Sequence, residues 1–125
     1  MNQNPAKLWD IHVDYVSRPL INNNKIYAQP GAWDLLTGRP TGFTFTRSYR
    51  CGIISVSWNL PVFRSGTIGY IDLQESNETR NYGGTRVGCR INALPGGGLV
   101  LIPNGWSLCK CSCLIRADLA LQNQQ

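Results

Sequence analysis

Several residue types on which enzymes and membrane proteins depend are scarce in this sequence. Its 125 residues include seven Asp and Glu, one His and one Met. The longest apolar stretches, such as 98–102, span a few residues, whereas a membrane-spanning helix needs about 20. Residues 1–5 provide neither the basic segment nor the apolar stretch of a secretory signal. We therefore expect no membrane span and no secretion signal in the chain as given.

The scarcity of histidine and carboxylates also argues against catalysis. A Ser-His-Asp or Cys-His arrangement would depend on His12 alone, which lies near Asp10 and Asp14 in an alternating segment. Glu75 and Glu78 are close in sequence, but they belong to a polar stretch typical of a solvated loop. We predict no catalytic residues and a protein that is not an enzyme; a small hydrolase would rest on His12 only.

The five cysteines do not have the spacing of a closed metal site. Cys109, Cys111 and Cys113 are two residues apart, which on a strand places neighbours about 7 Å apart in a row. Together with Ile115, Ala117 and Leu119 they form one small apolar face, so we expect them in the core. An odd number cannot pair fully within the chain, which favours a reducing compartment. We predict no metal and no cofactor.

The positive charge is made mostly of arginine. Nine of the twelve basic residues are Arg, and the three lysines are Lys7, Lys25 and Lys110. No basic run occurs, so a basic surface has to be assembled by the fold. The planar guanidinium suits bidentate contact with phosphate, although exposed Arg also protects sheet edges and maintains solubility. The candidate nucleic-acid-binding residues are Arg47, Arg50, Arg80, Arg86 and Arg90.

Apolar residues recur with period two along much of the chain, which is typical of β-strands and predicts an all-β fold. We expect a single domain over residues 1–125, an antiparallel β-sandwich of jelly-roll type with seven or eight strands and short polar tails. Turns are predicted at 22–24 and 64–66, and one helical turn at 34–38. The expected strands are 11–15, 25–28, 43–49, 54–58, 67–73, 85–91, 99–102 and 106–119.

Aromatic residues support two further interpretations. Interleaved with Arg, they would form a stacking surface for single-stranded nucleic acid, and in an all-β chain they also fill the core. A lectin-like or toxin-like module would instead stack sugars on exposed rings. The candidate sugar-binding residues of this alternative are Trp33, Tyr70, Tyr82 and Trp106.

The order of features over residues 53–108 resembles the core of the plant-virus thirty-kilodalton movement-protein superfamily, which is itself similar to viral single-jelly-roll capsid proteins. The resemblance covers under half of the chain. It departs at Gln74, where the family often has a basic residue two positions after its signature aspartate, here Asp72. The segments that carry it are Ile54-Ser55-Val56-Ser57-Trp58-Asn59-Leu60-Pro61, Gly66-Thr67-Ile68-Gly69-Tyr70-Ile71-Asp72, Thr85-Arg86-Val87-Gly88-Cys89 and Leu99-Val100-Leu101-Ile102-Pro103-Asn104-Gly105-Trp106-Ser107-Leu108.

This resemblance implies a non-enzymatic viral β-sandwich protein with a capsid, movement-like or silencing-suppressor role. Such a protein is expected to form homo-oligomers through sheet edges and to contact nucleic acid through its Arg residues. It would be found in the host cytoplasm or in the virion. The small carbohydrate-binding or toxin-like β module is the alternative.

Overall fold

The computed structural model describes residues 5–14, 17–48, 51–105 and 115–122. These residues form eleven strands and no helix, which confirms the all-β class. Within this part of the chain, therefore, no helix is long and apolar enough to cross a membrane. The strands are β1 (Leu20–Asn22), β2 (Lys25–Ala28), β3 (Gly31–Asp34), β4 (Pro40–Thr44), β5 (Ser55–Ser57), β6 (Leu60–Ser65), β7 (Thr67–Tyr70), β8 (Arg80–Asn81), β9 (Leu94–Gly96), β10 (Leu99–Ile102) and β11 (Leu119–Gln122).

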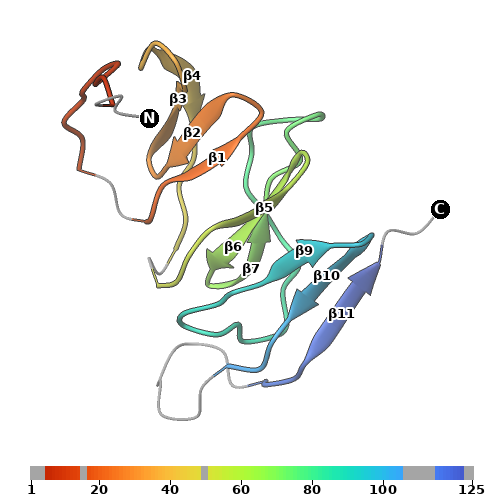
Figure 1. Cartoon of the computed structure of the whole chain (residues 1–125). Coiled ribbons are helices and arrows are strands. Elements are labelled where there is room, and N and C mark those ends of the chain that lie inside the picture. Colours follow the sequence, from red (N-terminus) through yellow and green to blue (C-terminus); the bar gives the residue numbers. More distant parts are fainter. Residues whose placement is uncertain (1–4, 15–16, 49–50, 106–114, 123–125) are drawn as a thin grey trace.

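The strands form three antiparallel sheets, each made of consecutive strands. Their orders are β1-β2-β3-β4, β5-β6-β7-β8 and β11-β10-β9. Figure 1 shows the second sheet in the middle of the molecule, with the first sheet on one side and the third on the other. The described pairings are those of three meanders and include no Greek-key connection, so they do not confirm the jelly-roll topology.

Local chemistry accounts for the turns of the first sheet. The hairpin between β1 and β2 pairs Asn22 with Lys25, so Asn23 and Asn24 are its two central residues. Both have positive φ, 47° and 57°, which asparagine tolerates better than most residues. The sequence correctly predicts this turn at 22–24.

The predicted helical turn at 34–38 is confirmed as a single turn, and it makes the connection from β3 to β4. The Asp34 carboxylate accepts hydrogen bonds from the backbone N–H of Leu36 and of Thr37, at 3.0 and 2.8 Å, and from the Thr37 hydroxyl. The Gly38 N–H bonds back to the Asp34 carbonyl at 2.9 Å, and Gly38 has a φ of 69°. This turn aligns the two strands without continuing into a helix.

The same hydrogen bonds predict how the turn responds to acid. The backbone and hydroxyl donors of Thr37, with smaller contributions from Leu36 and Arg39, lower the pKa of Asp34 below 3.8. A carboxyl group whose pKa is lower in the folded state stabilises the fold above its unfolded pKa, and this contribution is lost as the pH falls through the lowered value. Amide NMR signals of Leu36 and Thr37 should titrate with a midpoint below 3.8, and a midpoint above it would contradict the arrangement.

Strand β6 lies at the centre of the packing because both of its faces are covered. Successive side chains of a strand point to opposite faces, so Val62 and Phe63 enter different clusters. Val62 packs in the cluster on the side of β6 that faces the third sheet, and Phe63 packs in the cluster on the side that faces the first sheet. The first cluster contains Val62, Ile68, Val87, Ala93 and Ile102, and the second contains Phe45, Ile54, Phe63 and Ile71.

Buried polar groups connect β6 to the segment that precedes β9. The Asn92 side chain is fully buried; its Oδ1 accepts the Arg64 backbone N–H at 3.0 Å, and its Nδ2 donates to the Gly88 carbonyl at 2.6 Å. The Arg64 guanidinium, also fully buried, donates through Nη1 to the Cys89 Sγ at 3.2 Å. Because buried polar groups require partners, these contacts fix how the loop before β9 lies on the middle sheet.

Some expected strand positions are wrong. Residues 11–14 form no strand, and the segment expected as 43–49 is strand only to Thr44, in β4. The turn expected at 64–66 begins too early, because Arg64 and Ser65 belong to β6. Residues 59–61 are expected to end the strand at 54–58, and β5 does end at Ser57, but β6 begins at Leu60 and includes Pro61. Pro61 lacks only its N–H, and its carbonyl still accepts the Ile71 N–H at 3.0 Å.

The C-terminal expectations change as well. Within 85–91 the structure has one isolated bridge, from Val87 to Asn104, in place of a strand. The long strand expected over 106–119 is not found at 115–118, and β11 begins at Leu119. Ile115, predicted to be in the core, is 63% exposed, while Cys109, Cys111 and Cys113 lie outside the described residues.

Candidate ligand-binding groove

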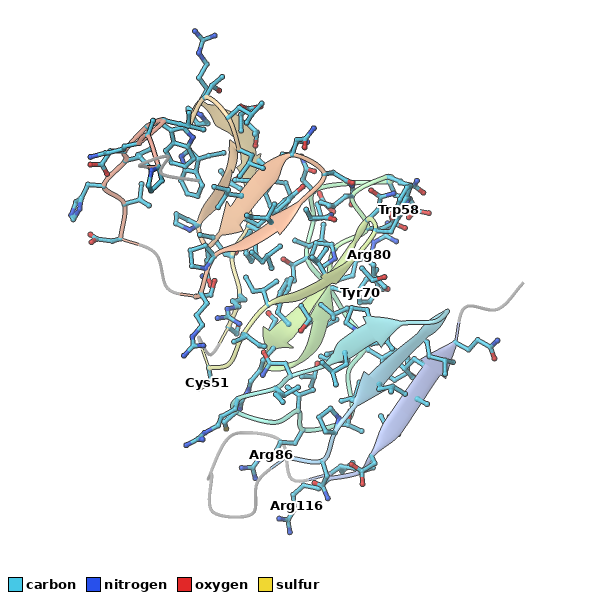
Figure 2. All side chains as sticks on the ribbon, viewed as in Figure 1. Cys51, Trp58, Tyr70, Arg80, Arg86 and Arg116 are labelled. Carbon is cyan, nitrogen blue, oxygen red and sulfur yellow. The ribbon has the colours of Figure 1, made fainter. Side chains whose placement is uncertain are left out.

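An open groove of about 590 Å³ lies between the middle sheet and the sheet β9–β11. Its volume is in the range of pockets that bind small molecules. One wall is formed by the β5–β6 turn, β7, β8 and the segment 72–75, and the other by the β9–β10 hairpin and the end of β11. Figure 2 shows Trp58, Arg80 and Tyr70 following one another along this side of the middle sheet.

The pairing of β7 with β8 brings three chemically important side chains to one face. Tyr70 lies directly opposite Arg80, and the Tyr82 N–H bonds to the Ile68 carbonyl at 3.0 Å, which continues the same register. Because alternate residues share a face, Arg80 and Tyr82 point the same way as Tyr70. All three line the groove.

Trp58 is presented at the groove by an unusual turn. Ser57 pairs with Leu60, so Trp58 and Asn59 are the two central residues of the β5–β6 hairpin. Trp58 has a φ of 50°, in the left-handed region that a bulky side chain rarely adopts. Its indole is 75% exposed, and its carbonyl accepts hydrogen bonds from the Asn22 and Asn23 side chains of the β1–β2 turn. A strained and exposed tryptophan is a feature of binding sites rather than of a core.

The charges in the groove are arranged as an ion pair plus one further carboxylate. Arg80 Nη1 lies 2.9 Å from Glu75 Oε2, and both side chains are about half exposed to solvent. This carboxylate raises the pKa of the Arg80 guanidinium, with a smaller contribution from the neighbouring Tyr70. Asp72 adds a second carboxylate to the lining. Among the described lining residues, two acidic groups thus face one basic group.

The inner wall of the groove is apolar. Leu60, Tyr70, Val100 and Leu121 are half-buried, pack against the first core cluster and line the groove. Val100 lies opposite Leu121 on one side and Pro95 on the other, so these three form one row across the third sheet. The groove is therefore the open end of a hydrophobic core, with polar and aromatic groups at its mouth.

The structure does not gather the predicted nucleic-acid residues into one surface. Arg47 is 7% exposed; its guanidinium donates to Gln29 Oε1 at 2.8 Å and to the Gly52 carbonyl at 3.1 Å, and burial lowers its pKa. Arg86 is also buried and lies well apart from Arg80 in Figure 2. Arg90 is exposed, whereas Arg50 lies outside the described residues.

Of the predicted sugar-binding residues, the structure brings Tyr70 and Tyr82 into the groove. Trp33 is buried on β3, and Trp106 lies outside the described residues. The alternation of Trp58 with Ile54 and Val56 predicts an apolar strand face for its side chain, so the sequence pattern does not indicate Trp58 as a binding residue. The available signal was its position next to Asn59 between two alternating segments, which is typical of a hairpin turn.

The described residues contain no group of three His, Cys, Asp or Glu side chains that could hold a metal ion. No family model, curated protein or solved structure matches this chain. The resemblance to viral jelly-roll proteins, and with it self-association and contact with nucleic acid, therefore stays a prediction. The chemistry of the groove is the remaining basis for assigning a function.

Proposed function

We propose that this protein is a non-enzymatic binding module that holds an uncharged carbohydrate in the groove between its middle and third sheets. The observation that carries the proposal is the exposed Trp58 at positive φ, at the mouth of a groove that also contains Tyr70 and Tyr82. Flat aromatic faces bury the C–H surface of a sugar ring, while amide and carboxylate oxygens accept hydrogen bonds from its hydroxyl groups. Asn59, Gln74 and Gln122 supply such polar groups around the rings.

The charge balance of the groove favours a neutral ligand over a nucleic acid. Single-stranded nucleic acid also stacks on aromatic residues, but its phosphates require unopposed basic groups. Here Arg80 is already paired with Glu75, and Asp72 adds a further negative charge. Phosphates would be repelled by these carboxylates, whereas sugar hydroxyls can donate hydrogen bonds to them.

The proposal predicts binding on an array of neutral glycans, confirmed in solution by a titration that follows tryptophan fluorescence. Tyr82→Ala should weaken binding of the glycans that score on the array by up to about tenfold, because stacking on an aromatic ring contributes roughly 0.5–1.5 kcal/mol. Tyr82→Phe keeps the ring and should retain most of the affinity. Leu36→Ala, an exposed change outside the groove, is the matched control and should bind like the parent.

Two results would count against the proposal. A silent array with unchanged fluorescence would remove its basis. A mobility shift of single-stranded RNA or DNA at low salt that is lost in Tyr82→Ala would show instead that the aromatic groove serves nucleic acid.

A further inference from the structure

The groove combines a polar, aromatic mouth with an apolar inner wall, and a simple sugar would use only the first of these. The inner wall is formed by Leu60, Val100 and Leu121, which are half-buried and continuous with the core cluster around Val62 and Ile68. When a ligand covers half-buried apolar side chains and removes them from water, the free energy of the complex is lowered and binding becomes more favourable. The wall is therefore suited to an apolar group that is attached to the sugar.

The mouth also restricts the kind of amphiphile. A fatty acid or phospholipid would bring an anionic group to the rim, where Asp72 and Glu75 lie and where Arg80 is already paired with Glu75. Among the described lining residues no second Arg or Lys is available to receive it. An uncharged polar headgroup meets no such cost, because hydroxyl groups both donate and accept hydrogen bonds.

We infer that the ligand is an amphiphilic glycoside, with its neutral sugar stacked at Trp58 and Tyr82 and its apolar aglycone lying against Leu60, Val100 and Leu121. This inference rests on the proposed function and specifies the class of carbohydrate that the groove takes. One row of side chains across the third sheet supports this placement of the aglycone. It consists of Pro95, Val100 and Leu121, which line the groove as a continuous apolar strip.

The test is a series of methyl, hexyl and octyl β-D-glucosides, titrated by calorimetry below their micellar concentrations, with 1-octanol as a chain that lacks the sugar. Affinity is expected to rise about threefold to fourfold for each methylene that reaches the inner wall. Octanol should bind far more weakly than octyl glucoside. Affinity that does not change from methyl to octyl glucoside would overturn the inference while leaving the proposed carbohydrate function intact.

The opposite failure is distinguishable. Octanol binding as tightly as octyl glucoside would show that the sugar contributes nothing, which would overturn both the inference and the proposed function. Absence of octyl glucoside binding, when a glycan from the array still binds, would overturn the inference alone.

A pair of variants places the aglycone. Leu121→Ala, on the inner wall, should reduce the gain in affinity from methyl to octyl glucoside at least threefold. Leu101→Ala changes an exposed residue one position beyond Val100, outside the groove lining, and should behave like the parent. Equal effects of the two variants would contradict the placement, and the glucoside series on the unmodified protein remains decisive if Leu121→Ala does not fold.

Discussion

Replacing Trp58 with glycine is expected to weaken carbohydrate binding about 30-fold relative to the parent protein. The Trp58→Gly variant is also expected to be more stable than the Trp58→Ala variant. The loss of affinity follows from removing a large exposed ring, for which truncation typically costs about 2 kcal/mol. The gain in stability follows from the φ of 50°, which glycine adopts freely and alanine does not. We expect Trp58→Gly to exceed Trp58→Ala by roughly 1 kcal/mol in free energy of unfolding.

Two measurements separate these effects. Calorimetry with the carbohydrate identified on the array gives the affinity of each variant, and urea unfolding gives its free energy of unfolding. Both variants lack the indole, so their affinities should be equal, while their stabilities should differ. If Trp58→Ala is as stable as Trp58→Gly, the turn is not strained, and if either variant retains parental affinity, Trp58 is not part of the site. An equal loss of affinity in both variants, together with the higher stability of Trp58→Gly, would show that the indole contributes to binding and that the turn carrying it is strained.

The largest loss of stability is expected for Phe63→Ala. The Phe63 side chain is fully buried on β6, lies 5.4 Å from the Phe45 ring between centroids, and packs in the cluster between the middle and first sheets. Removing a fully buried phenylalanine ring typically costs about 3–5 kcal/mol, through lost burial and the cavity that remains.

Urea unfolding measures this change as well, with Leu36→Ala as the control that should alter stability by less than about 0.5 kcal/mol. Phe63→Leu should lose less than half as much as Phe63→Ala, because it refills most of the cavity. A loss below about 1 kcal/mol for Phe63→Ala would mean that the first sheet does not pack on the middle sheet through this residue.

The fold class could be predicted from the sequence because period-two alternation is a local property. Lys25–Ala28 and Leu99–Ile102 are strands with the bounds that the pattern indicates, and the Asn-rich turn before Lys25 was also predicted. The errors occur where tertiary contacts override the pattern. Residues 59–61 are expected to form a strand end, yet β6 begins at Leu60 and includes Pro61, and both faces of β6 are buried by other sheets.

The candidate site was predicted only in part. Residue type alone indicates Tyr70 and Tyr82 as sugar-binding candidates, whereas it indicates Arg80 as a candidate for contact with nucleic acid. That these three share one face depends on the register of β7 with β8, which pairs Tyr70 with Arg80. The ten-residue separation between Tyr70 and Arg80 carries no periodic signal from which this register could be deduced.

The all-β class, the scarcity of catalytic groups and the excess of Arg over Lys can be read from the amino-acid sequence, because they follow from composition and local alternation. Which Arg residues are buried, and which side chains meet in a groove, depends on the packing of the three sheets. Arg47 and Arg86 are buried, whereas Arg80 is paired with Glu75 beside exposed rings. The reason is physical: burial and pairing depend on which sheets pack together, and contacts between residues distant in sequence set that packing.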